Sequence, residues 1–167
     1  MAISDAGEQQ HEPAPPEPHE ITSQKQRTFR NWFPRLKVTP ATFTSARTPV
    51  YNCFAYAAGE FGRQWEPTRF DAYWPAALEG NDSVDACTQV YGALGYEPCE
   101  LDATLEAGFE KIAFYVVRGA VQHAARQMPS GRWRSKIASF EDIEHETPHE
   151  LECDMYGEVV LILKRRR

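Results

Sequence analysis

Residues 111–127 consist of two segments of strand character joined by a dipeptide that favours a turn. Residues 111–117 are mostly apolar, β-branched or aromatic, and residues 121–127 alternate in polarity. Arg118-Gly119 stands between them, and a Gly-containing dipeptide at this place is typical of a tight hairpin turn. We therefore expect an antiparallel hairpin here, which excludes an all-helical fold.

Helical patterns come before this hairpin, and further strand patterns come after it. Residues 53–59 form a predicted short helix with Asn52 as N-cap and either Gly59 or Gly62 as its end, and residues 82–95 carry apolar residues at helical spacing. Residues 133–138 and 158–163 are predicted strands, the second nearly continuous in apolar residues and so expected inside the sheet. Helices followed by an antiparallel sheet define an α+β fold.

The chain of 167 residues is long enough for one domain with a real core and too short for two. Residues 1–24 are rich in proline and glutamate and offer little to bury, which predicts a disordered tail. Residues 25–167 are then the single globular domain. Three prolines interrupt residues 28–50, so we expect an extended lead-in there rather than a helix.

Charge and hydropathy exclude several classes of function. The net charge is -6, and the distribution of charged residues along the chain does not indicate a large basic face. Both observations argue against a nucleic-acid partner. The final Lys164-Arg165-Arg166-Arg167 run is expected to be a solvated tail after the last strand. No segment approaches the ~18 consecutive apolar residues of a membrane-spanning helix.

Cysteine usage and the N-terminal residues favour the cytoplasm. Four cysteines in a chain of this length are too few for a small secreted domain stabilised by disulfide bonds. The first residues also lack a basic region followed by an apolar one, so we expect no signal peptide. Reduced thiols follow from that location, and nothing in the sequence calls for a cofactor.

Cys53 is the strongest candidate for a chemical role. It lies in the first turn of the predicted helix, where unpaired backbone N–H groups and the helix dipole lower the pKa of a thiol. A thiolate nucleophile needs an imidazole base, and His123 lies on a predicted strand whose alternate residues are expected to oppose this helix. The Cys53 backbone N–H is the natural donor to an oxyanion.

The next predicted strand offers two candidates for a third group, depending on its register. Ser135 can orient an imidazole, whereas Lys136, together with Arg126, suits an anionic ligand better. His145 is an alternative orienting group or base.

Two resemblances bear on this region. The segment Asn52-Cys53-Phe54-Ala55-Tyr56-Ala57-Ala58 resembles the nucleophile helix of papain-like hydrolases of the CHAP and NlpC kind. That resemblance implies a papain-like arrangement of N-terminal helices followed by an antiparallel sheet. It also implies Cys53 as nucleophile, His123 as base and Ser135 as third residue, acting on a small amide or peptide.

A wider resemblance covers roughly residues 29–167. The chain is similar to a bacterial domain family of unknown function. The segments that carry the similarity are Tyr51-Asn52-Cys53, Gly95-Tyr96-Glu97-Pro98-Cys99, Gly108-Phe109-Glu110-Lys111, His123-Ala124-Ala125-Arg126-Gln127, Gly131-Arg132-Trp133-Arg134-Ser135-Lys136, Asp142-Ile143-Glu144-His145 and Tyr156-Gly157-Glu158-Val159-Val160. This similarity implies no particular activity.

A noncatalytic function stands beside the hydrolase hypothesis. Most free cysteines are small buried hydrophobes, and His123 can equally be a structural histidine. The chain would then be a binding or immunity-type module. Its partner would be a protein, and the loop from Trp65 to Trp74, with Asn52 nearby, would supply the contact surface.

The segment His145-Glu146-Thr147-Pro148-His149 matches the zinc-protease pattern H-E-x-x-H, but we expect no metal there. The pattern needs both histidines on one continuous helix. Pro148 breaks that helix and instead starts a new one, with Thr147 as N-cap and Glu150 closing a capping box.

Overall fold

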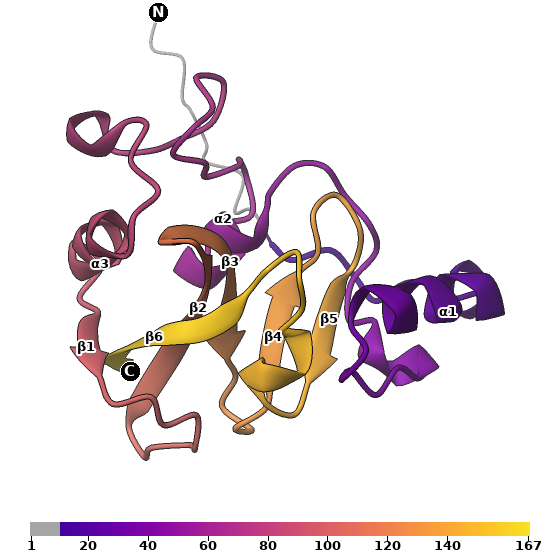
Figure 1. Ribbon diagram of the computed structural model, residues 1–167. Helices are drawn as coiled ribbons and strands as arrows, with labels where there is room; N and C mark the ends of the chain where they lie inside the picture. Colours follow the sequence, from indigo (N-terminus) through magenta and orange to yellow (C-terminus); the bar gives the residue numbers. More distant parts are fainter. Residues whose placement is uncertain (1–10) are drawn as a thin grey trace, which may run out of the picture.

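An antiparallel sheet of six strands, in the order β1-β6-β2-β3-β4-β5, organises residues 11–167, the part of the chain that the computed structural model describes (Figure 1). The strands are β1 (Glu97–Cys99), β2 (Phe109–Val117), β3 (Ala120–Gln127), β4 (Trp133–Lys136), β5 (Asp142–His145) and β6 (Glu158–Arg166). The helices are α1 (Ser23–Trp32), α2 (Cys53–Ala58) and α3 (Val84–Gly92), with short 3-10 turns at Pro18–Glu20, Pro40–Thr42, Ala76–Leu78 and Pro148–Leu151. The predicted α+β class is confirmed.

Strands β2 and β3 form the predicted hairpin. The turn between them has positive φ at Arg118 (50°) and Gly119 (81°), as a two-residue hairpin loop requires. Strand β6 lies between β1 and β2, so the expectation that the last strand is interior is also confirmed.

A bulge in β3 changes which residues share a face. Val116 pairs with Val121 and Tyr115 pairs with His123, which leaves Gln122 as an extra residue between two aligned pairs. Val121 consequently packs with the helices, whereas Ala125 packs on the opposite face. The expectation that residues 121–127 alternate without interruption, with His123 on the helix-facing side, is therefore wrong.

Each face of the sheet carries its own apolar cluster. The first cluster joins α2 and α3 to the sheet, and its sheet members include Ile112, Phe114 and Leu163. The second cluster joins α1 to the other face, where Phe29 and Trp133 are almost fully buried. In Figure 1, α1 lies beside β5 and α3 lies beside β1, at opposite ends of the sheet.

Helix α1 replaces part of the predicted extended lead-in. Thr22 caps it by accepting a hydrogen bond from the Lys25 backbone N–H at 3.1 Å. Residues 23–32 contain no proline, and the first proline of the lead-in, Pro34, follows the helix end. Phe29 then packs edge-on against Phe43 at 4.9 Å between ring centroids. The expectation of an extended segment was wrong for residues 28–32 because the breakers lie beyond them.

The two segments predicted as N-terminal and C-terminal tails are partly ordered. Strand β6 continues to Arg166, with Lys164 paired to Lys111 and Arg165 paired to Glu110 across β2, so the terminal basic run is mostly strand. At the other end, Ile21 is buried. The predicted disordered tail spans residues 1–24: residues 1–10 lie outside the described residues, whereas residues 18–20 form a 3-10 turn and α1 begins at Ser23, so disorder is wrong for that part. The domain boundary at residue 25 stays a prediction.

Candidate active site

Asn52 fixes the start of α2 and docks a distant loop onto it. Its Oδ1 accepts hydrogen bonds from the backbone N–H of Ala55 at 3.2 Å and of Trp65 at 3.0 Å. Its Nδ2 donates to the Trp65 carbonyl at 2.6 Å. Gly59, in the left-handed conformation, ends the helix and is thus the one of the two predicted end residues that is used. The Asn52 amide is thus engaged with backbone, and it serves the site as an anchor rather than as a ligand-binding group.

We expect Asn52→Ala to lower the free energy of unfolding by about 2–3 kcal/mol. The substitution removes an N-cap and two further backbone hydrogen bonds. Asn52→Asp is the matched variant, because it retains both acceptor bonds and loses only the donation to Trp65. Urea denaturation measures both, and an Asn52→Ala protein within about 0.5 kcal/mol of the wild type would contradict this role.

Cys53 is buried at the first position of α2. Its side chain lies in the first cluster, and its residue is 9% exposed. The Ala124 backbone amide on β3 and the Phe54 amide in its own turn lower the pKa of the Cys53 thiol. Burial raises the pKa of the thiol to about 12, and these amides offset only part of that effect. The expected lowering of the Cys53 pKa is therefore wrong.

His123 is fully buried between two tyrosines. Its ring stacks on Tyr156 at 4.1 Å between centroids and 4° between planes, and it meets Tyr115 edge-on at 5.1 Å. Neither ring nitrogen has a hydrogen-bond partner among residues 11–167. Burial, followed by the nearby His145, holds the pKa of His123 well below its ordinary value. The imidazole is neutral at pH 7 and has an available lone pair.

Cys53 and His123 line the same pocket, of about 390 Å³, although they approach it from different sides of the sheet. His123 directly precedes Ala124, whose backbone amide lowers the pKa of the Cys53 thiol. Tyr156 also lines this pocket. The remaining lining residues are Asn52, Phe54, Gln64, Glu66, Arg69, Gln122, Ala138 and Ser139.

Ser135 and His145 pair with one another instead of with His123. The Ser135 Oγ lies 3.0 Å from His145 Nε2, and His145 Nδ1 lies 2.8 Å from the Thr147 carbonyl. Because a carbonyl only accepts, Nδ1 carries the hydrogen and Nε2 accepts from the serine hydroxyl. Burial lowers the pKa of His145 to about 4. Neither residue lines the pocket of Cys53.

Tyr115 and Tyr156, rather than Ser135 or His145, contact the His123 ring and fix its position. Neither tyrosine was predicted from the sequence. Tyr115 is recognisable as a strand residue, but the pairing that sets it opposite His123 depends on the bulge. Tyr156 precedes Gly157, whose φ of 77° suits glycine. A turn glycine just before the last strand was the one local signal that this segment is constrained.

The predicted binding residues are engaged elsewhere. Arg126 Nη2 lies 3.1 Å from Glu110 Oε2, and the fully buried Lys136 donates to the Phe140 carbonyl. Trp65 and Trp74 are 5% and 9% exposed, so the structure places both in the core rather than on a contact surface. The exposed aromatic of this loop is Phe70, at 96%.

The H-E-x-x-H segment is split as predicted. His145 ends β5, and Thr147 caps a separate 3-10 turn whose Glu150 completes the capping box. His149 lies in that turn and contacts Glu152 at 2.9 Å. Within residues 11–167 no three histidine, cysteine or acidic side chains gather closely enough to hold a metal ion.

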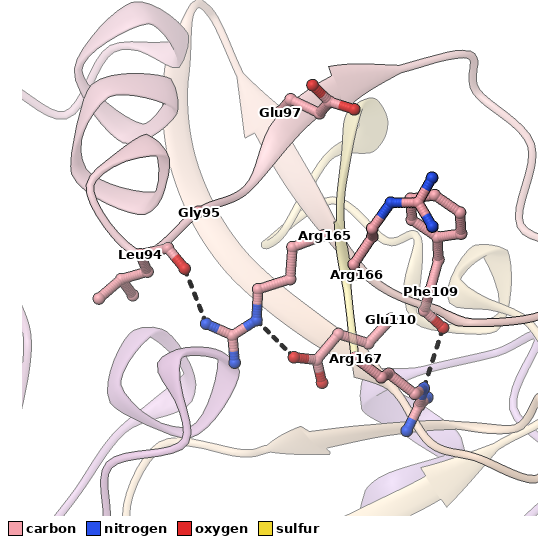
Figure 2. A pocket seen from close by; sticks show the side chains of 8 residues that line it. All are labelled: Leu94, Gly95, Glu97, Phe109, Glu110, Arg165, Arg166 and Arg167. Atoms are coloured by element: carbon pink, nitrogen blue, oxygen red, sulfur yellow. Dashed lines mark hydrogen bonds and ion pairs between the residues drawn. The ribbon is translucent and has the colours of Figure 1, made fainter.

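A larger pocket, of about 660 Å³, lies at the end of β6 and carries different chemistry (Figure 2). Arg165 donates from Nη1 to the Leu94 carbonyl at 2.9 Å and contacts Glu110 through Nε. Arg167 donates to the Phe109 carbonyl at 3.0 Å. Its lining has neither thiol nor imidazole, so the candidate site remains the smaller pocket.

Fold and site define an α+β protein with a buried cysteine and histidine on one pocket at the start of a short helix. The chain belongs to the family described as a domain of unknown function (DUF7689), which it matches over residues 42–164. That match includes Cys53 and His123, and it confirms the resemblance to a family of unknown function. No curated protein and no solved structure matches the chain, and the papain-like resemblance stays a prediction. No helix in the described part of the chain is long and apolar enough to span a membrane.

Proposed function

We propose that the protein is a thiol hydrolase that cleaves a small amide or peptide bond, with Cys53 as nucleophile and His123 as general base. The observation that carries the proposal is that the thiol and an imidazole without a hydrogen-bond partner among residues 11–167 line one pocket. An unpaired buried imidazole costs free energy, and such groups are tolerated chiefly at functional sites; a neutral imidazole can act there as a proton acceptor.

The two groups start neutral rather than as a thiolate and an imidazolium. Burial raises the pKa of Cys53 and lowers that of His123. His123 therefore accepts the thiol proton while the sulfur attacks the carbonyl carbon, and the Cys53 backbone N–H donates to the developing oxyanion. The imidazolium then protonates the leaving amine, and water hydrolyses the resulting thioester with His123 again as base.

The pocket lining favours a polar, uncharged substrate. Ser139 and the Gln122 amide oxygen supply neutral polar groups that match those of an amide, whereas Gln64 is engaged with the Pro49 carbonyl and with Arg69. The two charged lining residues have partners of their own, because Arg69 is paired with Asp71 at 2.7 Å and Glu66 accepts from Thr68.

Acetylation by p-nitrophenyl acetate, located by peptide mass spectrometry, tests this function. Cys87 is the control within the same chain, because it is also buried and its pKa is also raised to about 12. It lines none of the pockets described above, so it lacks the imidazole of the Cys53 pocket. We expect Cys53 to be acetylated at least about 100-fold faster than Cys87 at pH 7. Equal rates at the two thiols would refute the proposal.

A binding module is the second candidate, and Phe70 is the observation that favours it. A phenylalanine that is 96% exposed at the tip of a loop is suited to contact with a partner protein. In that case Cys53 would react no faster than Cys87, and Phe70→Ala would weaken partner binding without changing the fold.

The proposal includes a cytoplasmic location in a bacterium. All four cysteines are free, two of them buried in the core, which agrees with a reducing compartment.

A further inference from the structure

His123 gains a positive charge in the proposed reaction, at a place that is shielded from water. The thiol proton moves from the Cys53 sulfur to the imidazole, the sulfur forms a bond to the carbonyl carbon, and one electron pair of the C=O bond moves onto the oxygen. The resulting imidazolium is fully buried, and neither ring nitrogen has a hydrogen-bond partner among residues 11–167. A charge that is taken out of water without a partner is strongly disfavoured, so the reaction needs a group that stabilises it.

Neither the predicted third residue nor the acidic residue of the pocket supplies this stabilisation. Ser135 donates to His145, and burial keeps His145 neutral at pH 7 by lowering its pKa to about 4. Glu66 lines the pocket, but it accepts a hydrogen bond from Thr68. Burial and the nearby His145 both lower the pKa of His123, and no acidic side chain in the described part of the chain raises it.

The face of the Tyr156 ring does contact the imidazole. The two rings are nearly parallel, at 4° between planes and 4.1 Å between centroids. An aromatic ring attracts a cation that lies over its face within about 6 Å of the centroid, most strongly where water is excluded. Burial holds the pKa of Tyr156 well above its ordinary value, so the residue offers the face of a neutral ring and not a phenolate charge. The attraction is therefore much stronger for the imidazolium than for the neutral imidazole.

Two further aromatic residues hold the Tyr156 ring in place. Phe33, at the end of α1, packs against it at 5.4 Å between centroids, and Tyr115 lies at 6.2 Å. Tyr115 is itself anchored, because its hydroxyl donates to the Pro148 carbonyl at 2.5 Å. The Tyr156 ring cannot turn away from the imidazole without displacing these buried side chains.

We propose that Tyr156 is a positioning residue of the hydrolase, whose ring face stabilises His123 as an imidazolium during proton transfer and takes the place of a polar third residue. The inference rests on the proposed function, because it requires His123 to act as the base. An interaction that is stronger in the transition state than in the ground state accelerates the reaction. In this arrangement Ser135 is free to pair with His145 instead.

Fluorinated phenylalanines at position 156 of the full chain test this role. Tyr156→Phe keeps the ring face, and we expect p-nitrophenyl acetate to acetylate Cys53 in this variant within about threefold of the wild-type rate. Mono-, di- and trifluorinated phenylalanine withdraw charge from the ring face with little change in shape. The rate should fall stepwise along this series, by at least about tenfold at the trifluorinated residue. An unchanged rate along the series would overturn the inference, because a ring that only fills space is insensitive to this change.

The same series at position 33 is the matched control. Phe33 is buried in the same cluster but packs against Tyr156 rather than against His123. We expect the rate to stay within about twofold of wild type there. An equal fall at positions 33 and 156 would show that fluorination only loosens the cluster, and it would also overturn the inference.

His123→Phe separates failure of this inference from failure of the proposed function. Without an imidazole there is no charge to stabilise, so the position-156 series should react at one slow rate in this background. If wild type and His123→Phe react equally fast, the proposed function fails and the inference fails with it. If His123→Phe is slower but the position-156 series is flat with His123 present, only the inference fails. A stepwise fall that persists in His123→Phe would likewise count against it, because the effect would not act through the imidazole.

Discussion

Gly157→Ala is expected to lower the free energy of unfolding by more than about 3 kcal/mol. An added Cβ would lie 2.0 Å from the Val116 carbonyl oxygen, and neither a Cβ nor a backbone carbonyl can rotate away from such a contact. The residue also has φ of 77°, a conformation that costs alanine about 1–2 kcal/mol. Because Gly157 follows Tyr156, the forced backbone shift should also displace the ring on which His123 stacks.

Gly80→Ala is the matched control for this effect. Gly80 has nearly the same φ, 75°, but nothing among the described residues lies within 4 Å of its added Cβ. It should therefore cost only the conformational strain of about 1–2 kcal/mol. Urea denaturation of both proteins gives the comparison, and equal losses would show that the contact with Val116 relaxes without cost.

Asp142→Asn is expected to change the pH dependence of stability by on the order of 3–4 kcal/mol. Burial on β5 raises the pKa of Asp142 from 3.8 in the unfolded chain to about 7 in the folded protein. Between these values the folded state holds a proton that the unfolded state has lost, so the wild-type contribution falls as pH rises from about 4 to 7.

Asparagine resembles the protonated acid and should remove this fall. The difference in unfolding free energy between Asp142→Asn and wild type should therefore grow in favour of the variant from pH 4.5 to pH 7.5. Denaturation series at fixed ionic strength measure it, and two parallel curves would contradict the raised pKa. The range stops at pH 7.5 because burial lowers the pKa of Lys136 to about 8, where half of its charge is lost.

Local signals in the sequence were sufficient for elements whose start and end are set by neighbouring residues. The N-cap at Asn52, the left-handed Gly59, the turn at Arg118-Gly119 and the capping box from Thr147 to Glu150 were all predicted and are all present. Each depends on hydrogen bonds or φ angles within a few residues, so the residue types at those positions are enough to predict it.

The arrangement of the site depends on tertiary structure and could not be predicted in the same way. The bulge at Gln122 follows from pairing with β2, and it moves His123 to the face opposite α2. Without the register, Ser135 and Lys136 were equivalent candidates; the structure pairs Ser135 with His145 and buries Lys136 near Phe140.

The pKa of Cys53 also depends on tertiary structure and could not be predicted from the local sequence. A helix start predicts stabilisation of a thiolate, and the backbone amides do lower the pKa of the thiol. Desolvation by the surrounding core outweighs them, and the extent of burial is a property of the whole fold. A mechanism that begins from a neutral pair is the consequence.

The rate of Cys53 acetylation in wild type and in His123→Phe tests the central claim most directly. Phenylalanine preserves the stack on Tyr156, and no described hydrogen bond is lost, because neither imidazole nitrogen has one. If His123 is the base, the wild type should react at least about 100-fold faster at pH 7. The variant should instead depend on the thiolate alone, its rate rising about tenfold per pH unit below the thiol pKa. Equal rates with the same pH dependence in both proteins would contradict the assignment of His123 as base and of Cys53 as nucleophile.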